Sequence, residues 1–269
     1  MDPRKPITPL EAPGVRSESV HVPRIDERLA PPETRLEYLH GIELFAAPVD
    51  PPHATRHADV TAVLRTAVAD GYIAAVDLLT RTEDASDFAP HASIYPADLD
   101  GEGHRRLEEL AFEIASEQSL SVPTNKAREL IRRGVRRVFC VLVKQSRVLE
   151  WSREADSWQT LLLDSVIEDR CFVVPIKVRA LLEAAAADDA VGSALLEKKN
   201  PVVVSALTNS KTEGVLEAKA SALVTVLGAR GIALDDAARA RIGAERNLEV
   251  LDRWIVRAAT ATSLDEVLG

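Results

Sequence analysis

Two residues of opposite charge stand out as candidates for chemistry. Glu113 lies inside the apolar run 110–115, where a buried charge is costly unless it is paired or binds a metal ion. Lys126 lies on the predicted helix that follows this run. Cutting a phosphodiester needs hard oxygen ligands for Mg²⁺ and a cation near the attacking water or the scissile phosphate. A glutamate and a lysine one element apart supply part of that set, and an ion pair between Glu113 and a nearby arginine is the alternative.

Strands and helices alternate around these two residues. Apolar residues recur on one helical face between Val60 and Val68 and predict a helix that Gly71 ends. Strands are predicted within "YIAAVDLLTRT", "HASIYP" and residues 110–115, and a helix in "VPTNKARELIRRG", ended by Gly134. A strand hairpin follows in "VRRVFCVLVK" and "RVLEWS". This order places the acid-bearing strand directly before the lysine-bearing helix.

The two ends of the chain differ from this middle part. Residues 1–33 hold seven of the 15 prolines and predict an extended or flexible tail. In "TRLEYLHGIELFAAP" the spacing predicts a short helix and then a strand from about 42 to 46. The Ala- and Leu-rich end predicts helices broken at "GARG", "ARIGAERN" and "TATS". We therefore expect a tail (1–33), a middle domain (34–180) and a helical C-terminal region (181–269).

The acidic balance of the chain limits its partners. A formal net charge of −9 disfavours a generic affinity for nucleic acid, so any contact with DNA must come from a local basic patch. The alternative for the arginines near Gly134 is that they complement the C-terminal end of their helix. The candidates for a patch that tracks phosphates are Arg128, Arg132, Arg133, Arg136 and Arg137.

The cysteines and the apolar runs predict a cytoplasmic protein. Cys140 and Cys171 lie in apolar runs without ligand-type spacing, which favours buried thiols in a reducing compartment over a disulfide. The N-terminal residues show no signal-peptide pattern. No apolar run reaches the ~18 residues of a membrane span, so no membrane partner is expected.

Several short motifs, taken in order, resemble the bacterial Uma-two family of the PD-(D/E)XK restriction-endonuclease-like superfamily. The resemblance covers roughly residues 34 to 180. It rests on "LEYLHG" with Glu37, "PPH" ending at His53, "APHASIYP", "FEIAS" with Glu113 and Ser116, Lys126, and "RRGVRRVF".

The resemblance implies a fold, an activity and a site. The fold is an α/β (α+β) one, with a central mixed sheet flanked by helices. The activity is metal-dependent hydrolysis of DNA by an endonuclease. Glu113, Glu37 and the residue at position 91 would hold one or two Mg²⁺ or Mn²⁺ ions, and Lys126 would orient the water or stabilise the developing negative charge. DNA is then the expected partner, and a homodimer is compatible with the family.

Two histidines depart from the family pattern. His91 stands where the resemblance places the main metal-bridging aspartate, and His40 stands where it places the acid before glycine. Imidazole is neutral, monodentate and softer than carboxylate, so it suits Zn²⁺, Mn²⁺ or Fe better than Mg²⁺. The acids that could stand in are Glu43, Asp77 and Asp87. His53 and His57, four residues apart, could hold a metal on a helix face, but no third and fourth ligand is evident.

Three hypotheses follow. The first is an active endonuclease that uses Glu113, Lys126, Glu37 and His91. The second is a nuclease-fold protein that no longer cuts, needs no metal, and binds nucleic acid or a protein partner. The third is an interaction protein whose helical tail oligomerises.

Overall fold

The computed structural model describes residues 23–30, 34, 36–45, 50–116 and 119–269. The predicted tail, residues 1–33, lies mostly outside the described residues. The contacts divide the chain into two compact units, Met1–Val191 and Gly192–Gly269. Each unit is described by itself below.

A mixed six-stranded sheet forms the centre of the first unit. In spatial order its strands are β10 (Ser157–Thr160), β9 (Arg147–Ser152), β8 (Arg137–Leu142), β7 (Leu110–Ala115), β6 (Ala92–Pro96) and β3 (Tyr72–Val76). β7 and β8 are parallel, and the other neighbours are antiparallel. The parallel pair is joined through helix α2 (Ser121–Arg133), as a parallel connection requires a crossover. The predicted mixed α/β fold is confirmed.

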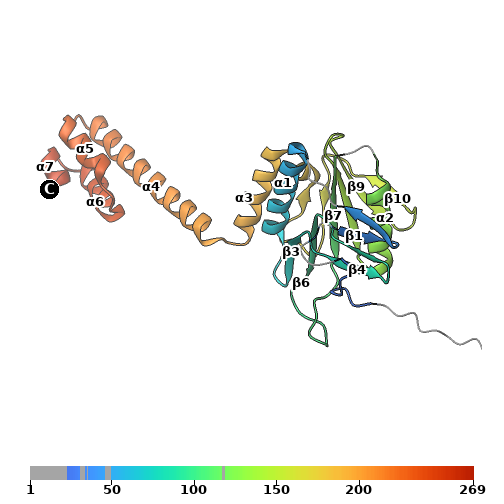
Figure 1. Cartoon of the computed structure of the whole chain (residues 1–269). Coiled ribbons are helices and arrows are strands. Elements are labelled where there is room, and N and C mark those ends of the chain that lie inside the picture. The colour runs from blue at the N-terminus through green and yellow to red at the C-terminus, as the bar shows by residue number, and fades with distance from the viewer. Residues whose placement is uncertain (1–22, 31–33, 35, 46–49, 117–118) are drawn as a thin grey trace, which may run out of the picture. The chain divides into compact units, whose positions relative to one another are not determined.

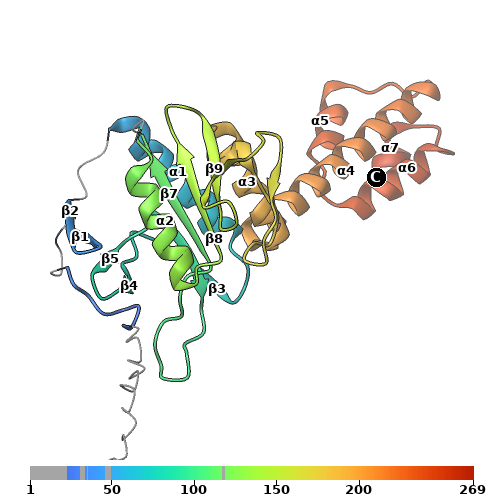
Figure 2. The same cartoon turned by 90° about the vertical axis from the view of Figure 1, so that its right-hand side faces the viewer.

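Two helices cover opposite faces of this sheet (Figure 1 and Figure 2). α1 (Pro51–Ala67) contacts β3 and β7, and α2 contacts β8. All residues of β7 from Leu110 to Ile114 are buried, because helices lie on both of its faces. Gly134 ends α2 with φ of 121°, a backbone conformation that side chains rarely adopt, as the sequence predicted. The sheet and these two helices therefore fix where Glu113 and Lys126 lie.

A second, four-stranded sheet corrects one prediction. Its order is β2 (Ile42–Phe45), β1 (Leu36–Leu39), β5 (Ser86–Phe88) and β4 (Thr80–Glu83). The short helix predicted before Gly41 is wrong, because β1 and β2 form a hairpin there. His40 and Gly41 have φ of 52° and 75°, which makes the two-residue turn that reverses the chain. The helix had been predicted because Leu36, Leu39 and Ile42 are spaced three residues apart, which is also the spacing of an apolar helical face.

The end of α1 also differs from the prediction. The helix stops at Ala67 and Val68 is its C-cap, so Gly71 does not end it. Gly71 has φ of 84° and instead lies in the turn that leads into β3. Val68, the residue after the helix, pairs with Phe172 in an isolated β-bridge. This pairing requires extended backbone at Val68, so the helix ends at Ala67.

Short elements complete the first unit, and helices make up the second. The short elements are β11 (Val166–Ile167), β12 (Ile176–Lys177) and the 3₁₀ helix η1 (Val178–Leu181), and the boundary between the units falls within helix α3 (Ala184–Glu197). The second unit holds α4 (Pro201–Ala229), α5 (Asp236–Ala244), α6 (Leu248–Ala258) and α7 (Leu264–Leu268). Its core includes Leu223, Leu227, Ile242, Leu251 and Trp254. The predicted helices and their breaks are confirmed, and none of the described helices has the length and apolarity to cross a membrane.

Candidate active site

The four residues predicted to do chemistry meet at one end of β6 and β7. Glu113 is on β7, Lys126 on α2 and Glu37 on β1, and His91 precedes β6. His91 Nδ1 lies 2.7 Å from Glu113 Oε2, and Lys126 Nζ lies 2.7 Å from Glu37 Oε2. Lys126 Nζ is 4.0 Å from Glu113 Oε1, an ion pair that is too long for a hydrogen bond. Four separate elements therefore build one charged cluster.

Glu113 and Lys126 carry charge inside the protein. Glu113 is 2% exposed and Lys126 is 5% exposed. Burial by itself raises the pKa of Glu113, but the charge of Lys126 and the hydrogen bond from His91 hold it below the ordinary value. Burial likewise lowers the pKa of Lys126, but the carboxylates of Glu113 and Glu37 raise it above its ordinary value. Both groups are therefore charged at neutral pH.

His91 is held by its neighbours on both its ring and its backbone. Burial lowers the pKa of its imidazole, but the hydrogen bond and charge of Glu113 raise it above the ordinary value. The ionised carboxylate can only accept, so His91 Nδ1–H donates to it. His57, on α1, donates from Nε2 to the carbonyl oxygen of His91 at 2.8 Å. His57 is thus a positioning residue for His91.

His53, one turn before His57 on α1, completes the cluster. Its ring centroid lies 5.1 Å from that of His91. Ser116 Oγ donates to Asp50 Oδ1 at 3.2 Å, so it accepts the hydrogen bond from His53 Nδ1 at 3.0 Å. His53 Nε2 is then the nitrogen that carries a lone pair. Burial, followed by the charges of His91 and His57, lowers the pKa of His53, which keeps the ring neutral.

Glu37 is placed to hold Lys126 rather than an ion. Its Oε2 contacts Lys126 Nζ, and its Oε1 accepts from the backbone N–H of Ala89 at 2.9 Å. Lys126 Nζ also donates to the carbonyl oxygen of Ala89 at 3.4 Å. Both Glu37 oxygens are engaged, so binding a metal through Glu37 would require one of these contacts to break.

The acids considered as stand-ins for position 91 lie in different places. Asp77 follows β3, and its backbone N–H donates to the carbonyl oxygen of His91. The charge of Asp77 contributes to raising the pKa of His91 and the pKa of Lys126. Asp87 Oδ2 instead accepts from the backbone N–H groups of Leu29 and Ala30. Glu43 is exposed on β2. Asp77 is therefore the acid that adds negative charge beside the site.

The donor atoms fit a divalent cation. Among the described residues, six buried side-chain polar atoms have no hydrogen-bond partner, and two of them are Glu113 Oε1 and His53 Nε2. A buried polar atom without a partner costs about 1–3 kcal/mol. A cation near Glu113 would bind an oxygen that has a 4.0 Å ion pair with Lys126 but no hydrogen bond, and the donor set of carboxylate and imidazole suits metal ions.

Comparison with known proteins places the chain in a family. Residues 23–172 match the model of the Uma2 family, whose description is "Putative restriction endonuclease". The chain belongs to the Uma2 family. The crystal structure of a "putative nuclease" from Anabaena variabilis is 14% identical with a TM-score of 0.47. That match covers 56% of this chain and 90% of the other. No curated protein matches the sequence.

A second cluster lies near the first and is better paired. Among the residues that the structure describes, donor atoms of three side chains lie within 4.8 Å of one another at His40, Glu83 and Glu129. His40 Nδ1 is 2.9 Å from Glu83 Oε1, and His40 Nε2 is 3.7 Å from Glu129 Oε1. Arg132 bonds to both carboxylates. His40 is thus part of a network of hydrogen bonds and ion pairs with Glu83, Glu129 and Arg132.

The five arginines of the predicted phosphate-tracking patch all contact groups of the protein. Four of them pair with carboxylates, and Arg133 donates to the carbonyl oxygen of Pro23. The paired arginines are Arg128 with Asp156, Arg132 with Glu83 and Glu129, Arg136 with Glu109 and Asp169, and Arg137 with Glu150 and Asp169. These neighbours reduce the positive potential that a patch for DNA would need.

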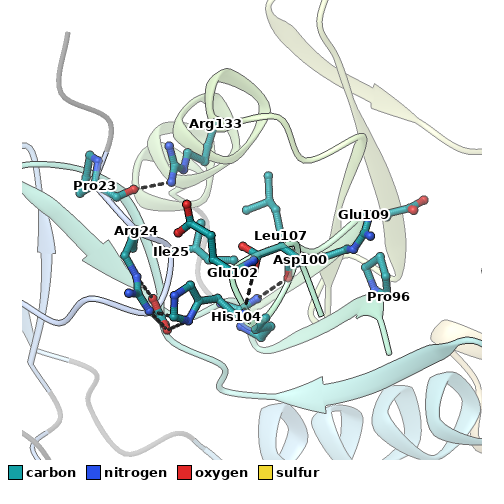
Figure 3. A pocket seen from close by; sticks show the side chains of 13 residues that line it. Pro23, Arg24, Ile25, Pro96, Asp100, Glu102, His104, Leu107, Glu109 and Arg133 are labelled. Atoms are coloured by element: carbon teal, nitrogen blue, oxygen red, sulfur yellow. Dashed lines mark hydrogen bonds and ion pairs between the residues drawn. The ribbon is translucent and has the colours of Figure 1, made fainter. Parts of the chain in front are cut away.

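A pocket of about 600 Å³ lies elsewhere in the Uma2 region (Figure 3). Its lining includes Pro96, at the opposite end of β6 from His91, and residues 23–26 and 104–107. Within it Arg24 pairs with Asp26 and also donates a hydrogen bond to His104 Nδ1. The four predicted site residues do not line this pocket, so the candidate site is a separate feature.

The sequence did not reveal the supporting residues of this site. His53 and His57 stood out by their spacing, but nothing linked them to Glu113. Asp50 and Ser116 are 66 residues apart and meet in the fold. The available signal was the pair of histidines on one helical face, directly after the helix-capping Asp50.

Proposed function

We propose that this chain is a metal-dependent endonuclease that hydrolyses phosphodiester bonds of DNA. One observation carries the proposal. Glu113 is buried and forms an ion pair with Lys126, and the Oε1 atom of Glu113 has no hydrogen-bond partner. Burying two charges is costly, and a fold gains little stability from it. A bound cation would interact with the Glu113 carboxylate, and a bound phosphate would interact with the Lys126 ammonium group, which would explain why both charges are buried. Family membership supports the same reaction class.

Each residue has a distinct role in this proposal. Glu113 and His91 would hold the divalent ion, Mg²⁺ or Mn²⁺ by resemblance to the family. When bound, such an ion supplies Lewis acidity and lowers the pKa of its water. Lys126, protonated and buried, stabilises negative charge that develops on the phosphate. Glu37 fixes the Lys126 ammonium group by a 2.7 Å contact.

A second candidate is a nuclease-fold protein that binds nucleic acid or a partner without cutting. One observation favours it. The hydrogen bond between His91 and Glu113, at 2.7 Å, lets the site neutralise its own charge with an imidazolium instead of a metal ion. An aspartate at position 91 could not do this, because two carboxylates in contact repel unless a cation lies between them.

Plasmid nicking separates the two candidates. We expect nicking with Mn²⁺ or Mg²⁺ that chelation abolishes and that Glu113→Gln reduces at least 100-fold. Glu83→Gln, in the neighbouring cluster, is the matched control and should leave the rate within about twofold. If the natural chain is inert with both ions and His91→Asp nicks DNA, the non-cutting candidate holds. Nicking that persists in Glu113→Gln would rule out the assigned site.

A further inference from the structure

We propose that His53 is a third metal-binding residue, which with His91 and Glu113 makes the site selective for a Zn²⁺-type cation over Mg²⁺. This inference rests on the proposed function, because it identifies the ion that the same site takes. Its basis is the position of the His53 ring, the hydrogen bond at its Nδ1 and the lack of a hydrogen-bond partner at its Nε2; the ring comes from α1 and was not part of the predicted metal set.

The His53 ring presents a bare nitrogen inside the protein. The side chain is 6% exposed, and Nε2 has no hydrogen-bond partner. The hydroxyl of Ser116 donates a hydrogen bond to Asp50, so its oxygen accepts one from His53. The proton of the His53 ring is therefore on Nδ1. When a histidine binds a metal through one nitrogen, the N–H of its other nitrogen commonly donates to an oxygen acceptor. This hydrogen bond fixes the tautomer and orients the ring. The Asp50–Ser116 pair supplies that arrangement.

The spacing of the rings fits a shared ion. Two imidazoles bound to one tetrahedral Zn²⁺ at about 2.1 Å place their ring centroids about 5 Å apart. The rings of His53 and His91 have centroids 5.1 Å apart and an interplanar angle of 47°. Glu113, which bonds to His91, adds the oxygen donor. His91 Nδ1 and Glu113 Oε2 are 2.7 Å apart, but with His53 these side chains do not bring three donor atoms within 4.8 Å of one another, so binding requires a side-chain rotation that brings the His53 nitrogen closer to the other two donors.

The donor chemistry sets the selectivity. Mg²⁺ prefers six oxygen ligands and retains several waters, whereas imidazole nitrogen binds Zn²⁺, Co²⁺ and Ni²⁺ much more strongly. Two nitrogens and one carboxylate would make three protein ligands, the number found in catalytic zinc sites. The side chain of His91 is 26% exposed, so the cluster is open to solvent beside this residue.

Calorimetry on the full-length, tag-free protein tests the assignment. We expect one Zn²⁺ ion per chain at this site and at least tenfold weaker binding of Mg²⁺. His53→Gln should weaken Zn²⁺ at least tenfold and leave Mg²⁺ affinity unchanged, and Ser116→Ala should weaken Zn²⁺ by about tenfold. His40→Gln, in the neighbouring histidine cluster, is the matched control and should change neither affinity at this site.

A second measurement uses the unaltered chain and does not depend on the folding of a variant. In NMR spectra of ¹⁵N-histidine-labelled protein, Zn²⁺ should shift the Nε2 resonance of His53. The inference is overturned if that resonance does not move, if His53→Gln binds Zn²⁺ as tightly as the natural chain, or if Zn²⁺ binding is lost only in His40→Gln.

The two proposals fail in different ways. Nicking supported by Mg²⁺ that requires Glu113 but is unchanged by His53→Gln would overturn the zinc assignment and keep the nuclease. Zn²⁺ bound through His53 in a protein that nicks DNA with none of the ions would keep the assignment and overturn the nuclease.

Discussion

Two histidine–carboxylate clusters lie beside the same helix, α2, and differ in how their polar atoms are satisfied. Around Glu113 the carboxylate, the lysine and His53 are buried, and two atoms, Glu113 Oε1 and His53 Nε2, have no hydrogen-bond partner. Around Glu83 the groups are more exposed, and Arg132 bonds to both carboxylates. Charge that is buried without full pairing costs free energy, whereas the second network is paired and only its Glu129 is buried, so its cost is smaller. We therefore infer that the first arrangement is a binding site and that the second stabilises the fold.

The largest expected difference between the clusters is in catalysis. Glu113→Ala should lower the rate of plasmid nicking at least 100-fold, because it removes the proposed metal ligand. Glu83→Ala should leave the rate within about twofold, since Glu83 contacts His40, Ser86 and Arg132 and none of the proposed site residues. Equal losses in the two variants, measured with matched protein concentration and Mn²⁺, would remove the functional distinction.

Stability should separate the clusters next. Lys126→Ala leaves the buried Glu113 carboxylate without its cation and should lower the free energy of unfolding by about 3–5 kcal/mol. Arg132→Ala should lower it by less, because Arg132 and Glu83 reach solvent and the buried Glu129 keeps His40 as a neighbour. Urea unfolding followed by circular dichroism measures both values.

A paired replacement sharpens the stability comparison. Combining Lys126→Met with Glu113→Gln removes both charges and should recover part of the loss seen in Lys126→Ala. A double variant that is as unstable as Lys126→Ala would show that the loss comes from packing of the lysine stem rather than from the unpaired carboxylate.

The smallest expected effect is the pH dependence of the exposed cluster. Burial raises the pKa of Glu83, but hydrogen bonds from Ser86 and His40 and the charge of Arg132 lower it below the ordinary value. A lowered pKa in the folded state adds stability above the unfolded pKa and loses it as the pH falls through the folded value. Glu83→Gln should therefore cost less than about 1 kcal/mol at pH 7, and the difference should fade below about pH 4. A difference that grows on acidification contradicts this.

The sequence predicted the central part of the site because local pattern and order determine it. A charge in the middle of an apolar run marks Glu113 as buried, and the next element carries Lys126. Contacts between distant segments were beyond such reasoning, since no local pattern brings Ser116 to Asp50 and His53. The hairpin of β1 and β2 was misread for the opposite reason. Its apolar spacing fits a helix, and a left-handed backbone of the kind that His40 adopts is uncommon for residues other than glycine, although less so for histidine than for most.

The β1–β2 hairpin is fastened to α2 at two points with equal spacing in both segments. Glu37 contacts Lys126, and three residues further along each segment His40 contacts Glu129. The two contacts act like a pair of rivets that set the register of a strand against a helix. Deleting or inserting one residue between Glu37 and His40 could preserve one rivet but not both. Insertions and deletions should therefore be tolerated in loops outside the segment from Glu37 to His40, and not within it.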